Sequence, residues 1–521
     1  MNERDNRSVR RNPDTRLSSA VIAAHAQLAK ADKLRKAGNL PEAIKICESL
    51  IQKFPDYLGA LHTLGLIHMS GRNYGAALSL LMRAAMLDPD DWTILTNLAR
   101  LYLGLSAPEL SARTLEQALA IKDDDADIHC TLGQIYDHQC EYERAAGCFE
   151  KALECDPNHK AAAYELGSSY VYMGRLEDAA PAFLQAHSID RQFIAPIAAL
   201  CQLPAGLVDL NLQSAIEAVQ SSRGSDNEKL EFWVSFSKAA VFDKLKRHAE
   251  AWDHMVRANS IIFARHRQEN QDRVQGRQIV LQRARNFTRK SDKQEPANAE
   301  TPISLFILAP SRSGKTTLEM ILGTLDGVKR GYENPIVERS TRKTSQHSGL
   351  VTLARPTELP EELNPLFLEY YDKELLARAG GFKVFTNTHP ARISEIGRLI
   401  ETIPNARFAF IKRNINDIAL RIYMKHFLGN SNYYAYNIKS IFEEISWYQE
   451  IMDIWMKTFP ERCVMLQYED MVSDAGSALI PLAEQCGLAL PSTGLPQPGD
   501  DRGCSVPYAD FIASARQADD A

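Results

Sequence analysis

The residues best suited to chemistry lie in one segment, from Ser304 to Glu319. An apolar run is followed by a turn of small residues, Ala-Pro-Ser-Arg-Ser-Gly, and then by Lys-Thr-Thr at the expected start of a helix. In such a loop, backbone N–H groups and the helix N-terminus face a bound anion. The basic side chains would add positive charge, and the threonines would add hydroxyl donors. The candidate anion-binding residues are Arg312, Ser313, Gly314, Lys315, Thr316 and Thr317.

This loop has two interpretations. From Ala309 to Thr316 it has the pattern Ala-x-x-x-x-Gly-Lys-Thr, a nucleotide-binding P-loop with alanine in place of the first glycine. From Arg312 to Thr316 it has the pattern Arg-Ser-Gly-x-Thr, which resembles the phosphosulfate-binding loop of sulfotransferases. The first interpretation predicts a kinase or ATPase, and the second predicts an enzyme that transfers a sulfuryl group.

The elements around the loop alternate between short apolar runs and helical segments, which predicts an α/β domain with a mostly parallel sheet. Ligands of such sheets bind beyond the carboxyl ends of the strands, where the loop at 309–317 would lie. The expected strands are Ser304–Leu308, Gly381–Thr386, Arg407–Ile411 and Val464–Gln467. The expected helices begin at Thr316, lie around Ile393–Glu401 and Asp417–Phe427, and run through Lys439–Thr458.

The first half of the chain has a different pattern, which repeats every 34 residues. Pro55, Pro89, Asp123, Pro157 and Arg191 are evenly spaced, and small residues recur at fixed positions between them. Small residues let two helices approach closely, and a proline ends the second helix of each unit. The pattern resembles the tetratricopeptide repeat, a helical hairpin of this length. It predicts an all-α solenoid of five repeats over residues 23–191.

The remaining segments complete the expected domain order. Residues 1–22 are predicted to be a polar, disordered N-terminus, and residues 192–300 a helical connector with a degenerate repeat near 229–262 and a basic linker. The α/β domain is expected over 301–490, followed by an irregular tail over 491–521. The concave surface of a solenoid suits a protein or peptide partner. The alternative, that the repeats only brace or dimerise the chain, stays open, and the oligomeric state is not predicted.

Composition excludes several classes of partner. The chain has 521 residues and a net charge of −6, which gives no case for nucleic acid or a membrane surface as the main partner. No apolar run approaches the ~20 residues that a membrane span needs. Nine cysteines are scattered without a Cys-x-x-Cys pair. They predict reduced thiols in a cytoplasmic protein and no structural zinc.

Further landmarks in the second half resemble the sulfotransferase family, in particular its bacterial branch that joins tetratricopeptide repeats to a sulfotransferase domain. They are Gly331-Tyr332-Glu333, the run Ile403–Phe408, the turn Lys412–Asp417 and the strand end Val464–Asp470. The resemblance implies a P-loop-type fold and 3′-phosphoadenylyl sulfate as the sulfuryl donor. It also implies that Glu333 is the base, that Arg413 binds the donor's 3′-phosphate, and that no metal is required.

The chain departs from that branch at two places. Asn387-Thr388-His389-Pro390 stands where the branch has Asp-Lys-x-Pro, so a lysine that is thought to stabilise the transferring group is missing at Thr388. Either His389 or Lys315 would have to replace it. Arg421 stands where the branch has serine. A second arginine would either strengthen the anion site of Arg413 or block it.

The sequence therefore predicts a sulfotransferase acting on a hydroxyl acceptor of a protein, peptide or glycan, with Glu333, Lys315 and His389 as candidate catalytic residues. Arg413 and Arg421 join the loop residues as candidate donor ligands. One alternative is a divergent, non-catalytic interaction module. Another is an NTP-dependent kinase or ATPase, which needs an acidic residue at a strand end. The strand Arg407–Ile411 instead runs into Lys412 and Arg413, and Leu466–Asp470 offers only a weak candidate.

Overall fold

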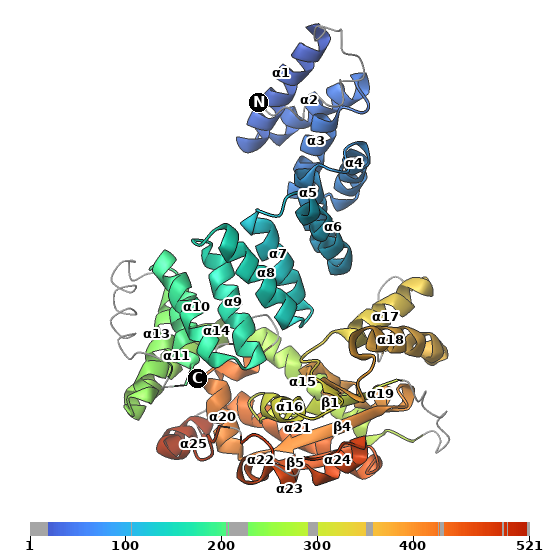
Figure 1. The fold of residues 1–521 in the computed structure, drawn as a ribbon. Coiled ribbons are helices and arrows are strands. Elements are labelled where there is room, and N and C mark those ends of the chain that lie inside the picture. Colours follow the sequence, from blue (N-terminus) through green and yellow to red (C-terminus); the bar gives the residue numbers. More distant parts are fainter. Residues whose placement is uncertain are drawn as a thin grey trace. The chain divides into compact units, whose positions relative to one another are not determined.

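The computed structural model describes residues 19–105, 107–204, 207, 228–289, 301–350, 358–425, 427, 432–491, 494–497 and 499–517. The chain divides into two compact units, residues 1–173 and 174–521 (Figure 1). Most of the predicted polar N-terminus and the linker stretch 290–300 lie outside the described residues. No helix in the described part of the chain has the length and apolar character needed to cross a membrane.

The first unit is an array of helices joined by short turns, and each helix packs against the next one along the chain. The predicted all-α array is thus confirmed. Its helices are α1 (Ser19–Lys36), α2 (Leu40–Lys53), α3 (Leu58–Ser70), α4 (Tyr74–Leu87), α5 (Trp92–Gly104), α6 (Pro108–Ile121), α7 (Ala126–His138), α8 (Tyr142–Cys155) and α9 (Lys160–Met173).

The repeating small residues lie where two helices of a repeat meet. A Cβ at Gly65 would lie 2.8 Å from the Leu81 side chain, and one at Gly133 would lie 2.6 Å from the Phe149 ring. Where the repeat has serine instead of alanine, the Ser111 hydroxyl donates a 2.8 Å hydrogen bond to the Ala99 carbonyl. Small residues therefore recur every 34 residues because the two helices of each repeat pack closely together at these positions.

Two glycines of this unit provide a stability test. Gly133→Ala is expected to destabilise the repeat unit by about 1–3 kcal/mol, because the new methyl group overpacks the contact with Phe149. Gly147→Ala, within α8, meets no atom within 4 Å and should stabilise the unit by about 0.5–1 kcal/mol. Hydrogen exchange of α7 and α8 in the full-length chain measures both. Equal effects of the two changes would contradict the close packing.

The second unit begins with five described helices: α10 (Leu176–Ile189), α11 (Ile194–Gln202), α13 (Glu228–Lys244), α14 (His248–Arg265) and α15 (Arg267–Arg285). The boundary between the units falls between α9 and α10, inside the fifth predicted repeat. Helices α13 and α14 pack together over the segment in which a degenerate repeat is predicted.

Helix α15 is rich in arginine, and one side of it packs against the α/β domain. Arg273 forms an ion pair with Glu444, and Arg277 donates to the other oxygen of the same carboxylate at 2.8 Å. The Glu444 side chain is fully buried, and the indole N–H of Trp447 donates to the Arg277 carbonyl at 2.9 Å. The basic residues of this helix therefore hold it against the α/β domain.

The α/β domain contains a five-stranded sheet in the order β2-β3-β1-β4-β5, and every adjacent pair is parallel. This confirms the predicted mostly parallel sheet. The strands are β1 (Ile303–Leu308), β2 (Val328–Lys329), β3 (Val384–Asn387), β4 (Ala406–Lys412) and β5 (Cys463–Gln467). Four of them match predicted strands within a few residues, and the two-residue β2 was not predicted.

Helices cover both faces of the sheet because the strands are apolar on both sides. Leu305 and Ile307 point to the face covered by α16 and α22–α24, and Phe306 and Leu308 point to the face covered by α17–α19 and α21. The remaining elements are α16 (Lys315–Leu322), α17 (Ile336–His347), η4 (Glu361–Leu363), α18 (Asn364–Ala379), η5 (Pro390–Ser394), α19 (Ile396–Thr402), α20 (Ile415–Tyr423), η6 (Tyr433–Tyr436), α21 (Ile438–Thr458), α22 (Tyr468–Ser473), α23 (Ala475–Ala478), α24 (Ile480–Cys486), η7 (Val506–Tyr508) and α25 (Ala509–Gln517).

The strand order locates the binding crevice. Strands β1 and β4 are neighbours at the centre of the sheet. After β1 the chain continues to β2 at one edge of the sheet, and after β4 it continues to β5 at the opposite edge. In open α/β sheets, ligands bind at such a switch point, outside the carboxyl ends of the strands. The loop after β1 and the residues after β4 both lie at this point.

The expected irregular tail over 491–521 is wrong in its second half, which contains η7 and α25. Tyr508 and Ile512 are one helical turn apart and are both buried, so they give this segment an apolar face. The Tyr508 hydroxyl donates to Asp243 of α13 at 2.7 Å, and Phe511 stacks on Trp252 of α14. The Pro- and Gly-rich start of the tail concealed this short helix.

Candidate functional site

The loop after β1 has a backbone conformation that few residues adopt. Arg312 has φ 64°, and Gly314, which directly precedes α16, has φ 100°. A Cβ on Gly314 would also lie 2.5 Å from the Tyr468 ring, so both conformation and space require glycine there. Left-handed backbone at a non-glycine residue is uncommon, and such strain clusters at functional sites.

Ser313 marks the interior of this loop. Its side chain is 0 % exposed, and its hydroxyl oxygen has no hydrogen-bond partner among the described residues. A buried hydroxyl without a partner is uncommon and calls for an explanation. The first turn of α16 follows, with the half-buried Thr317 and the exposed Thr316. A bound anion would give the Ser313 hydroxyl an acceptor and would lie at the positive end of the helix.

Lys315 reaches across from α16 to the end of β3. Its ammonium nitrogen lies 3.3 Å from the Thr388 carbonyl oxygen. Burial lowers the pKa of Lys315, while the charges of Glu333 and Glu319 act in the opposite direction. The Lys315 ammonium therefore lies at the end of β3, beside Thr388. The bacterial sulfotransferase branch that this chain resembles has a lysine at the position of Thr388.

The segment that carries Glu333 is fixed to β3 by its backbone. The Gly331 N–H donates to the Thr386 hydroxyl at 2.9 Å, and the Thr388 N–H donates to the Tyr332 carbonyl at 2.8 Å. A Cβ at Gly331 would lie 2.1 Å from the Thr386 carbonyl oxygen, and Tyr332 has φ 55°. These bonds hold the exposed Glu333 side chain beside the strand end.

Glu319 is a positioning residue that the sequence did not single out. It lies on α16 with 1 % exposure, accepts the Tyr332 N–H at 2.9 Å and accepts the Thr386 hydroxyl. Burial raises the pKa of Glu319, although these hydrogen bonds and the Arg330 charge oppose the shift. The available signal was a carboxylate on the apolar face of α16, beside Leu318 and Leu322.

His389 is held in place by hydrogen bonding and an adjacent acid. Its Nδ1 accepts the Ala391 N–H at 3.2 Å, and its Nε2 lies 3.6 Å from a carboxylate oxygen of Glu338. This pattern assigns the proton to Nε2. Burial and the charge of Arg392 lower the pKa of His389, so the neutral ring is favoured. The structure thus gives His389 the role of capping η5 beside the predicted site.

Arg413 follows β4 and is nearly enclosed, with a side chain 4 % exposed. Its guanidinium donates to the Arg312 carbonyl at 3.0 Å and to Oδ1 of Asp501 at 2.7 Å. It also lies over the Tyr468 ring, 4.1 Å from the centroid. Arg413 therefore connects the loop after β1 to a carboxylate from the C-terminal segment, which the sequence did not predict.

Arg421, on α20, contacts the same carboxylate. Its Nε donates to Oδ2 of Asp501 at 3.2 Å, while the Tyr468 hydroxyl donates to Oδ1 at 2.7 Å. Burial alone would raise the pKa of Asp501, but the Tyr468 hydrogen bond and the Arg413 charge hold it below its ordinary value. The second arginine thus points to the same position as the first and does not displace it.

Lys425, just after α20, is another cation that the sequence did not single out. Its ammonium lies 5.0 Å from the centre of the Phe427 ring. The charge of Arg312, together with burial, lowers the pKa of Lys425 to about 7, and Glu333 opposes this shift. Lys425 is therefore within electrostatic reach of the loop and of the candidate base.

Lys425 predicts a pH dependence of anion binding. An anion favours the charged amine, so affinity for adenosine 3′,5′-bisphosphate should be highest below about pH 7 and fall by up to about tenfold per pH unit above it. Lys425→Arg keeps its charge at these pH values and should flatten the profile. Calorimetric titrations between about pH 6 and about pH 8.5 measure both. Identical profiles for the two proteins would remove Lys425 from the site.

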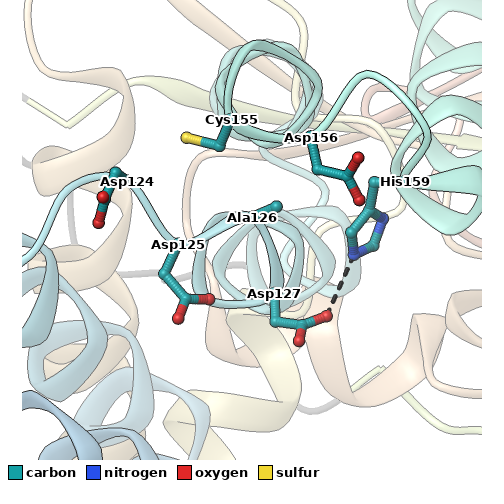
Figure 2. A pocket seen from close by; sticks show the side chains of 7 residues that line it. All are labelled: Asp124, Asp125, Ala126, Asp127, Cys155, Asp156 and His159. Carbon is teal, nitrogen blue, oxygen red and sulfur yellow. Dashed lines mark hydrogen bonds and ion pairs between the residues drawn. The ribbon is translucent and has the colours of Figure 1, made fainter.

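Among the residues that the structure describes, no group of three or more His, Cys, Asp or Glu side chains is arranged to hold a metal ion. A separate acidic hollow of about 270 Å³ lies on the repeat unit (Figure 2). It is lined by Asp124, Asp125, Ala126, Asp127, Cys155, Asp156 and His159. Its negative lining does not suit an anionic donor.

Comparison with known proteins matches the two halves of the chain to different families. Residues 302–492 match a family model described as the sulfotransferase family. Three tetratricopeptide-repeat models match residues 62–127, 126–159 and 148–180. The family model thus covers the loop, both arginines and the segment with Glu333.

Individual relatives are distant. An uncharacterized protein of Aquifex aeolicus (strain VF5) is 23% identical over 493 residues, covering 87% of this chain and 62% of that protein. Superkiller protein 3 of Schizosaccharomyces pombe is 29% identical over 125 residues, covering 23% of this chain and 9% of its own length. The crystal structure of MamA aligns with 31% of this chain and 95% of its own, at 23% identity and a TM-score of 0.30. The chain therefore spans less than two thirds of the length of these two sequence relatives.

Proposed function

Because this chain carries tetratricopeptide repeats ahead of a domain of the sulfotransferase family, we propose that the domain transfers a sulfuryl group from 3′-phosphoadenylyl sulfate to a hydroxyl acceptor. The observation that carries the proposal is the reach of Lys315 to Thr388 at 3.3 Å. This contact brings the anion loop after β1 together with the strand end beside Glu333. A cation and a carboxylate then flank the place where a sulfuryl group would pass between two oxygens.

The loop fits the phosphosulfate end of this donor. The buried Ser313 hydroxyl has no acceptor within the described part of the chain, and Gly314 has no side chain that could cap the first N–H groups of α16. When bound, the donor supplies a sulfuryl group activated by its 5′-phosphate. Ser313 and the helix N-terminus would bind its oxygens, while Arg312 and Lys315 would offset the negative charge. Charge stabilisation by preorganised donors is the main source of rate enhancement in such transfers.

The acceptor side depends on Glu333. Its carboxylate would take the proton of the acceptor hydroxyl, and the hydrogen bonds of residues 331 and 332 to Thr386 and Glu319 keep it beside Lys315. In this proposal Lys315 takes the place of the lysine that is missing at Thr388, and His389 helps by shaping the turn after β3. Arg413 and Arg421 would bind the donor's 3′-phosphate.

The proposal extends to the repeats, which would bind a polypeptide that is either the acceptor or a partner. Helical repeats of this kind present extended surfaces suited to such a role. All nine cysteines are free thiols, and we place the protein in the reducing cytoplasm.

The test follows release of adenosine 3′,5′-bisphosphate from 3′-phosphoadenylyl sulfate by the full-length protein, with water as the acceptor and EDTA present. We expect slow release that depends on Lys315. Absence of release above the uncatalysed rate, from a protein that also fails to bind the donor, would contradict the proposal. A nucleotide-hydrolysing enzyme would instead consume ATP and require Mg²⁺.

A non-catalytic interaction domain is the second candidate, and one observation favours it. Asp501 already satisfies Arg413 and Arg421, the two residues proposed to bind the 3′-phosphate. If that contact were permanent, the donor would lose its second anchor. Release and donor binding, measured together, separate the candidates, because a domain without its second anchor would neither release product nor bind the donor.

A further inference from the structure

The contact between Asp501 and the two arginines is organised like a bound anion. Oδ1 accepts from Arg413 at 2.7 Å and from the Tyr468 hydroxyl at 2.7 Å, and Oδ2 accepts from Arg421 at 3.2 Å. A terminal phosphate group would offer acceptor oxygens to the same donors, because arginine and hydroxyl donors bind carboxylates and phosphates alike. The carboxylate therefore stands in for an anionic ligand.

The burial of Arg413 explains why an internal carboxylate is needed. Its side chain is only 4 % exposed, and a buried charge without a counter-ion is strongly destabilising. Without ligand, the chain must supply a negative charge at this point. Asp501 does so from a position 32 % exposed, so its side chain is already partly in contact with solvent.

The segment that carries Asp501 is anchored on its C-terminal side. Asp417 accepts the N–H groups of Gly503 and Ser505 at 2.8 and 3.0 Å. Before this anchor, Asp500 pairs with Arg502, and the Arg502 guanidinium also donates to the Ser473 hydroxyl at 2.6 Å. A small change in the turn at 499–501 would therefore release the Asp501 carboxylate while the contacts of Arg502, Gly503 and Ser505 stay in place.

We propose that Asp501 is an internal counter-ion that competes with the phosphate of a ligand for Arg413 and Arg421. This inference rests on the proposed function, since it identifies the competing group as the 3′-phosphate of the donor. Asp501 then determines specificity. A ligand with a second phosphate displaces the carboxylate, whereas a ligand without one leaves it bound. The apparent affinity for the bisphosphate is lowered by the fraction of molecules in which Asp501 occupies the site.

Calorimetric titration of the full-length protein tests the proposal, with adenosine 3′,5′-bisphosphate and AMP as probes and EDTA present. Asp501→Asn removes the charge and should tighten binding of the bisphosphate by about tenfold or more, with AMP unchanged. Asp500→Asn removes a neighbouring charge whose ion pair is with Arg502, and it should behave as wild type. Unchanged or weaker bisphosphate binding by Asp501→Asn would overturn the proposal.

A second measurement does not depend on the variant. In wild-type protein, bisphosphate binding should increase hydrogen exchange of the amides at 499–501, because the displaced turn loses its contacts. Protection of these amides would overturn the proposal.

Inorganic phosphate separates failure of this proposal from failure of the proposed function. If phosphate raises the unfolding temperature of Asp501→Asn but not of wild type or of Arg413→Ala/Asp501→Asn, Asp501 is the counter-ion. If phosphate gives this result but adenosine 3′,5′-bisphosphate and AMP bind Asp501→Asn equally well, the proposed donor is wrong although Asp501 is a counter-ion. If wild-type protein binds the bisphosphate more tightly than AMP, but Asp501→Asn binds neither the bisphosphate nor inorganic phosphate more tightly than wild type, the proposed donor is supported. The proposed role of Asp501 as a counter-ion is then wrong.

Discussion

Replacing Lys315 with alanine is expected to weaken binding of adenosine 3′,5′-bisphosphate by about 10- to 100-fold, the range for loss of one hydrogen bond to a charged group. Its ammonium is held 3.3 Å from the Thr388 carbonyl, at the point where the loop after β1 meets the end of β3. A bound phosphate or sulfonate there would gain a charge-assisted hydrogen bond. Calorimetry on the full-length variant measures the loss.

Two further variants of the lysine experiment separate charge from packing. Lys315→Met keeps most of the aliphatic stem and should lose as much affinity as Lys315→Ala. Lys457→Ala removes the same charge from the exposed end of α21 and should bind like wild type. Wild-type affinity in Lys315→Met would show that the ammonium does not contact the ligand.

The second large effect is expected at Glu333. Glu333→Gln should lower the rate of sulfuryl transfer about 100-fold, because the amide cannot take the proton of the acceptor hydroxyl. Binding of the bisphosphate should stay within about twofold of wild type, since Glu333 is exposed and held by backbone bonds that the change leaves intact. Release of bisphosphate from the sulfated donor gives the rate, and calorimetry gives the affinity.

The matched control for Glu333 is Glu369→Gln, which changes an exposed carboxylate on α18. It should change neither rate nor affinity. If Glu333→Gln transfers sulfuryl groups at the wild-type rate, Glu333 is not the base. If it instead loses donor binding, its role is to hold the segment beside β3.

The repeats and the anion loop were predictable because their signals are local. A period of 34 residues with small residues in register places Gly133 against Phe149, and an apolar run before Ser313 and Gly314 predicts a strand, a loop and a helix. For the lysine missing at Thr388, the sequence offered two replacements, His389 and Lys315. The Lys315 ammonium lies 3.3 Å from the Thr388 carbonyl oxygen, which favours Lys315, and its role stays a prediction.

The rest of the site depends on contacts between distant residues, which local patterns do not report. Asp501 meets Arg413 across 88 residues, from a turn whose sequence suggested only an irregular tail. The position of Glu319 on the apolar face of α16 indicates burial, but only the fold shows its bonds to Tyr332 and Thr386. Lys425 follows a helix end, where a basic residue has a common structural explanation.

The central claim is that the loop after β1 binds a phosphosulfate donor and not a metal–nucleotide complex. Calorimetric titration of the wild-type, full-length protein at about pH 6.5 tests it most directly, below the pKa of Lys425. The account predicts that adenosine 3′,5′-bisphosphate binds in EDTA with at least about tenfold higher affinity than ATP with Mg²⁺. Tighter binding of ATP with Mg²⁺, lost when EDTA is added, would contradict it.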